Sequence, residues 1–110
     1  MPRLATTLDS ALRERLHSVL ARQPVTEAEL RKLSEEGRAC ELILSADLEH
    51  SEQRLAALAA DPTSSITDIA GTVRHVHELR PDLDELRELL VELEVRAREF
   101  RASWARPGLP

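Results

Sequence analysis

The chain is poor in the residues on which many fold types depend. Its 110 residues include one phenylalanine, one tryptophan, no tyrosine and only three glycines. Sheets favour aromatic side chains and their turns favour glycine, so this scarcity argues against a sheet-rich fold. The abundant residues are Leu, Ala, Glu and Arg, which lose little side-chain freedom in a helix. We therefore expect an all-α fold.

Other absences narrow the class of protein. Cys40 is the only cysteine, which excludes an intramolecular disulfide. The N-terminal residues lack the apolar stretch of a signal peptide, and no window reaches about 18 consecutive apolar residues. The net charge is −5, whereas a surface that binds nucleic acid needs an excess of Lys and Arg. We expect a cytoplasmic protein, or a nuclear one if the organism is eukaryotic, that binds neither nucleic acid nor a membrane.

Two helices are predicted in the N-terminal half. Recurrent leucines predict the first over residues 7–22, and Pro24 ends the pattern. Thr26 and Glu29 then form a capping box, in which each side chain can satisfy the free backbone N–H of the other residue. The apolar period that follows predicts that the second helix spans residues 27–60.

Two features of this second predicted helix concern its neighbours. Gly37 lies on the apolar face, where the missing side chain indicates close approach of another helix. Leu42, Ile43 and Leu44 form a belt that is apolar nearly all round the helix. Such a belt needs neighbours on more than one side, supplied either by other helices of the chain or by a second chain.

Pro81 is expected to divide the C-terminal half. A short apolar seam predicts a third helix over residues 65–79, and proline removes a helical N–H and disfavours helical geometry at the residue before it. A fourth helix is predicted over residues 82–104, with a flexible tail at residues 105–110. The expected architecture is one domain, residues 1–110, forming a small antiparallel bundle of about four helices, two of them long, with coiled-coil-like packing.

The fourth predicted helix carries the most regular pattern in the chain. Its apolar residues lie alternately three and four positions apart, which places them on one face of a helix that packs against another surface. Phe100 and Trp104, the only aromatic residues, either close the end of the bundle or anchor a partner. The predicted protein interface combines this face with the belt of the second helix: Leu86, Leu90, Leu93, Phe100, Trp104, Leu42 and Ile43.

No motif in the chain predicts catalysis. It contains no Gly-rich phosphate loop, nucleophile elbow or Cys/His cluster, and His75 and His77 project in nearly opposite directions from a helix. We expect no catalytic residue, no cofactor and no metal. The favoured hypothesis is a non-enzymatic helical adaptor or accessory subunit, which binds a protein partner or itself in a homo-oligomer or a hetero-complex.

Two alternatives stay open. The segment Val76-His77-Glu78-Leu79-Arg80-Pro81 resembles the H-box in the dimerisation and phosphotransfer helix of sensor histidine kinases, but lacks the residue that normally separates the arginine from the proline. This resemblance implies that His77 accepts a phosphoryl group and that Glu78 acts as the base. The other alternative is a small helical enzyme that uses scattered Arg and Glu in a polar cavity, which a wholly apolar core would exclude.

Overall fold

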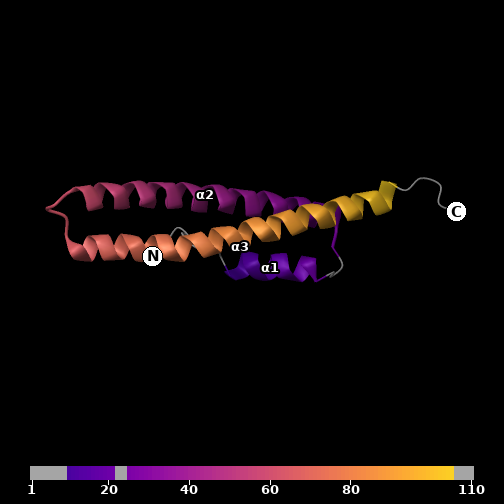
Figure 1. Cartoon of the computed structure of the whole chain (residues 1–110). Coiled ribbons are helices and arrows are strands. Elements are labelled where there is room, and N and C mark those ends of the chain that lie inside the picture. Colours follow the sequence, from indigo (N-terminus) through magenta and orange to yellow (C-terminus); the bar gives the residue numbers. More distant parts are fainter. Residues whose placement is uncertain (1–9, 22–24, 106–110) are drawn as a thin grey trace.

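Three helices make up the part of the chain that the structure describes. The computed structural model describes residues 10–21 and 25–105, with only the backbone at residues 104 and 105. Helix α1 spans Ser10–Leu20, α2 spans Glu27–Ala60 and α3 spans Ile66–Ala105. Figure 1 shows α2 and α3 as a long antiparallel hairpin, with α1 lying along part of it. The prediction of an all-α fold is confirmed, and the prediction of four helices is wrong.

Helix α2 has the bounds that its capping box and Pro62 predict. The Thr26 hydroxyl accepts a hydrogen bond from the backbone N–H of Glu29 at 3.1 Å and lies 3.2 Å from the Glu29 carboxylate. At the other end, the backbone N–H of Asp61 donates to the carbonyl of Leu58 at 3.3 Å. Local chemistry therefore sets where this helix starts and stops.

Helix α3 continues through Pro81, so the helices predicted over residues 65–79 and 82–104 are one. Pro81 is exposed, whereas Leu79 and Leu83 on either side of it are buried. A proline inside a helix costs about 3 kcal/mol, and full burial of one leucine side chain contributes about 1.5–3 kcal/mol. Burial of the leucines that flank Pro81 thus offsets the missing hydrogen bond, and tertiary packing overrides the local signal.

Helix α1 packs against both α2 and α3. Its Leu12 and Leu16 are buried, and Arg15 donates to Glu36 of α2. Arg13 lies 2.8 Å from Glu85 of α3. The predicted range for this helix, residues 7–22, extends at both ends beyond the residues that the structure describes. At the C-terminus, Ala105 still belongs to α3 rather than to the predicted tail, and residues 106–110 lie outside the described part.

The core is made of leucine apart from Val76, and its main cluster fills only one half of the rod. Its cluster of buried residues is Leu12, Leu16, Leu30, Leu33, Leu44, Leu79, Leu83, Leu86, Leu89, Leu90 and Leu93. This is the half where α1 covers the hairpin. Towards the turn that joins α2 to α3, residues such as Leu55, Leu58 and Ile69 are only half-buried. The described chain measures 74 × 27 × 18 Å, and its radius of gyration of 18.9 Å exceeds the roughly 13 Å expected of a compact domain of this length.

Gly37 lies where α2 and α3 approach closely. A methyl group added at this position would lie 2.4 Å from a terminal methyl of Leu90, well inside van der Waals contact. Gly37 and Leu90 are both buried. The sequence-based expectation of close helix approach at Gly37 is confirmed.

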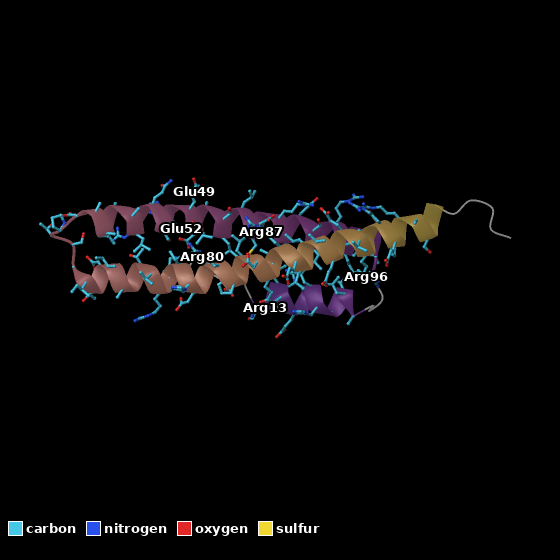
Figure 2. The ribbon with its side chains drawn as sticks, in the orientation of Figure 1. Arg13, Glu49, Glu52, Arg80, Arg87 and Arg96 are labelled. Carbon is cyan, nitrogen blue, oxygen red and sulfur yellow. The ribbon has the colours of Figure 1, made fainter. Side chains whose placement is uncertain are left out.

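Ion pairs join α2 and α3 along the length of the hairpin. Arg87 donates to Glu41 at 3.1 Å, and Arg101 donates to Glu27 at 3.1 Å. Figure 2 shows Glu52 and Arg80 pointing toward one another from the two helices, and these side chains are also hydrogen-bonded. Exposed pairs of this kind contribute about 0.2–1 kcal/mol each, so they specify the pairing of the two helices more than they stabilise it.

The turn between α2 and α3 is held by side-chain hydrogen bonds. The hydroxyl of Thr63 donates to the Asp61 carboxylate at 2.7 Å, and the backbone N–H of Thr63 donates at 2.9 Å. These two hydrogen bonds, the first being the stronger influence, hold the pKa of Asp61 below its usual value. Ser65 accepts a hydrogen bond from the backbone N–H of Thr67 at 3.1 Å and so caps the start of α3.

Candidate protein interaction surfaces

Three of the seven residues predicted to form an interface lie inside the molecule. Leu86, Leu90 and Leu93 of α3 are at most 7% exposed and belong to the core that α2 and α1 cover. Phe100 is partly buried against the same cluster. At Trp104 the structure describes only the backbone, within α3, and the side chain lies outside the described part. The regular seam of the C-terminal helix therefore serves packing within the chain.

Leu42 and Ile43 are the two predicted interface residues that reach the surface. They are 72% and 54% exposed, whereas Leu44, the next residue, is fully buried. Among the described residues, the apolar belt of α2 therefore has a neighbour on the side of Leu44 alone. Neither Leu42 nor Ile43 is brought together with the seam of α3, which packs on the opposite side of α2.

The exposed part of this belt continues as a row of small and neutral side chains. We call this row the outer face of α2. Its members are exposed and lie four and three positions apart: Ala39, Ile43, Ala46, His50, Gln53 and Ala57, with Leu42 beside them. Because this spacing follows one side of a helix, the outer face is a continuous strip with little charge.

A second apolar patch lies on α3. Val91 and Val95 are 62% and 47% exposed, and with Leu20 of α1 they line a shallow groove of about 270 Å³. Glu92, Arg96 and Glu99 form the rest of its lining. The sequence-based reasoning did not include Val91 and Val95 in the interface, because residues beside a seam can equally widen its buried face.

The charged groups of the described chain gather on the surface rather than in an internal cavity. A groove of about 370 Å³ between α2 and α3 is lined by four arginines, two glutamates and smaller side chains: Arg31, Arg38, Arg98, Arg101, Glu35, Glu94, Leu30, Leu93, Ala97 and Ser34. Arg38 is hydrogen-bonded to Glu94 there, and Arg101 to Glu27. Among buried residues of the described part, Ser51 is the one with a polar side chain. Within residues 10–21 and 25–103, the other buried residues are leucines, Val76 and Gly37.

The histidines of α3 differ in their surroundings. His75 lies with its Nε2 3.1 Å from the carboxylate of Asp47, which also accepts a hydrogen bond from Ser51 at 3.1 Å. His77 and Glu78 are exposed on the same helix, which continues without a break past Pro81. Across the described residues, no group of three His, Cys, Asp or Glu side chains is placed to hold a metal ion.

The candidate surfaces are apolar strips on the outside of a narrow rod, and charged side chains border them. Within the described ranges, none of the helices combines the length and the apolar character needed to cross a membrane. No protein-family model matches the chain, and no curated protein or solved structure matches it either.

Proposed function

We propose that this protein is a non-enzymatic helical adaptor or accessory subunit that works in the cytoplasm by binding another protein chain through the outer face of α2. The observation that carries this proposal is the exposure of Leu42 and Ile43 side by side in the middle of a long helix. Neither side chain belongs to the buried leucine cluster, so packing among the described residues does not account for their apolar character.

The energetics favour a partner on this face. Full burial of a Leu or Ile side chain contributes about 1.5–3 kcal/mol, and Leu42 and Ile43 leave most of this contribution unused. The alanines on either side of them, Ala39 and Ala46, allow a second helix to approach closely. Charged residues along the edges, among them Glu49, then discriminate between partners.

The shape of the molecule suits the role of an adaptor. The described rod is 74 Å long, and it carries Leu42 and Ile43 on α2 and a separate patch at Val91 and Val95 on α3. Two apolar patches on different helices give one small chain the means to contact two neighbours in an assembly. Binding then consists of burying aliphatic surface, with Glu and Arg side chains at the rim.

A photo-crosslinking experiment tests this proposal. Leu42 is replaced by benzoylphenylalanine in the full chain, which is expressed in its source cells and irradiated. The matched control carries the same group at Ala70, an exposed position on α3 that is 21 residues before Val91 and so away from both patches. We expect a discrete crosslinked protein from position 42 and none from position 70. If the folded chain gives no crosslinked protein at position 42, or gives the same products at both positions, the proposal is wrong.

A further inference from the structure

The outer face of α2 is bordered by charges in a self-complementary order. One flank of this face is the side on which α1 and His75 contact α2. Along it Glu36 comes first, and Arg54 follows about five turns later. Along the other flank the order is reversed, because Arg38 comes first and Glu49 follows about three turns later. The midpoints of both pairs fall within the same stretch, between Ile43 and Ala46.

This order fits an antiparallel copy of the same helix. When two identical helices pack antiparallel about a twofold axis, each flank meets the same flank of the other copy, running in the opposite direction. An acidic group before the midpoint then meets a basic group after it. Glu36 of one copy, which already pairs with Arg15 of its own α1, approaches Arg54 of the other. Arg38, which already pairs with Glu94 of α3, approaches Glu49.

We propose that a second copy of this chain packs antiparallel on the outer face of α2, with the twofold axis crossing between Ile43 and Ala46. The inference rests on the proposed function and names the partner of the same surface. In this arrangement Ile43 packs on Ala46 of the second copy, and Ala39 packs on His50. Leu42 lies beside this contact on both copies and is covered by it.

A parallel pairing of the same two faces is less favourable. It would set Glu35 against Glu35 and His50 against His50, since equal positions oppose one another near the centre of a parallel contact. The antiparallel register sets Glu35 against Gln53 instead. Figure 2 shows Glu49 pointing away from α3, so this carboxylate is directed toward a chain on the outer side of α2.

No described element covers the outer face of α2, and the contact is modest in size. Every residue of the outer face is exposed, and α1 and α3 both pack on other sides of α2. A contact from Glu36 to Arg54, which is centred on this axis, is about 27 Å long at 1.5 Å per residue, so the buried area falls at the lower end of stable interfaces. We therefore expect a dimer with a dissociation constant in the micromolar range.

The oligomeric state of the full chain provides the first test. Sedimentation equilibrium over a wide concentration range is expected to give a mass that rises from 12.3 kDa toward twice that value. Ala46→Glu places a charge at the centre of the contact and is expected to weaken the dimer at least tenfold. The matched control is Ala70→Glu, which adds the same charge at an exposed position of α3 and should leave the association unchanged.

Disulfide trapping tests the register. In a Cys40→Ala background, protein carrying Ala39→Cys is mixed with protein carrying His50→Cys and oxidised. The antiparallel register predicts mixed disulfides between the two and few between identical chains. Disulfides chiefly between two Ala39→Cys chains would show a parallel dimer and overturn this inference.

The two proposals fail in distinguishable ways. A chain that stays monomeric at all concentrations, while position 42 still crosslinks to a different protein, overturns the self-association and leaves the adaptor function standing. A monomer that gives no crosslink at position 42 overturns both. A dimer that Ala46→Glu and Ala70→Glu weaken equally would show that the contact lies elsewhere, which also overturns the inference.

Discussion

The two glycines inside helices offer a matched test of how α2 and α3 pack. Replacing either one by alanine adds one methyl group and removes the backbone freedom that makes glycine unfavourable in a helix, a gain of up to about 1 kcal/mol. At Gly71 of α3 the added methyl meets no atom within 4 Å. At Gly37 of α2 it would lie 2.4 Å from a terminal methyl of Leu90. The added methyl group therefore enters open space at Gly71 and an occupied contact at Gly37.

The expected outcomes differ in sign. Gly71→Ala should stabilise the protein by up to about 1 kcal/mol, because only the helix-propensity gain acts there. Gly37→Ala forces the buried Leu90 side chain or the helix to move, and overpacking of this kind costs about 1–3 kcal/mol. The net effect of Gly37→Ala is then a loss of stability of up to about 2 kcal/mol. The two variants should differ by roughly 1–3 kcal/mol in the free energy of unfolding.

Urea denaturation followed by circular dichroism measures this difference. Wild type, Gly37→Ala and Gly71→Ala are compared by their midpoints, provided that the dependence on denaturant is the same for all three. A Leu90→Ala substitution in the Gly37→Ala background supplies a further check, because the clash disappears with the leucine and the two substitutions should be less than additive in their loss of stability. If Gly37→Ala raises the urea midpoint as much as Gly71→Ala does, Leu90 does not pack closely against Gly37.

Two further predictions concern the turn and the first helix. Thr63→Val removes the hydroxyl donor to Asp61 and keeps the backbone donor, so the pKa of Asp61 should rise part of the way to its ordinary value in a carboxyl NMR titration. Because the folded-state pKa of Asp61 is lowered, this carboxylate contributes to stability above its unfolded-state pKa, and the contribution is lost as pH falls through its folded-state pKa. An unchanged pKa of Asp61 in Thr63→Val would contradict the role given to the Thr63 hydroxyl. Leu16→Ala empties a fully buried position of α1 and should lower the free energy of unfolding by about 2–5 kcal/mol, whereas Ala11→Gly on the exposed side of α1 should cost no more than about 1 kcal/mol. Equal losses in these two variants, measured by thermal denaturation, would mean that α1 is not docked through Leu16.

Helix boundaries could be predicted where local chemistry sets them and not where packing overrides it. Thr26, Glu29 and Pro62 act on their own neighbours, so the extent of α2 follows from the sequence. Pro81 also acts locally, but the apolar seam of α3 passes it without interruption, from Val76 through Leu79 to Leu83. That continuity was the signal for a single helix, and the local rule for proline obscured it.

The candidate surface was only partly predictable, for a related reason. Leu42, Ile43 and Leu44 have similar hydrophobicity, and their sequence does not say which side of α2 the other helices cover. The same ambiguity applies to Leu90, buried within the chain, and Val91, exposed beside it. Which apolar residues remain at the surface depends on where α1 docks, and this is a property of the assembled fold.

The hairpin also has a consequence for the order in which the chain folds. Across α2 and α3, Glu52 and Arg80 are 28 positions apart in sequence, whereas Glu27 and Arg101 are 74 apart. Loop closure is easier for the nearer pair, so proximity favours zipping from the turn. The deeply buried leucines, however, lie in the half remote from the turn, where they pack with α1. The end of the hairpin that closes first therefore buries the least apolar surface. The hairpin becomes stable only when the pairing of α2 with α3 extends to Leu44 and Leu79.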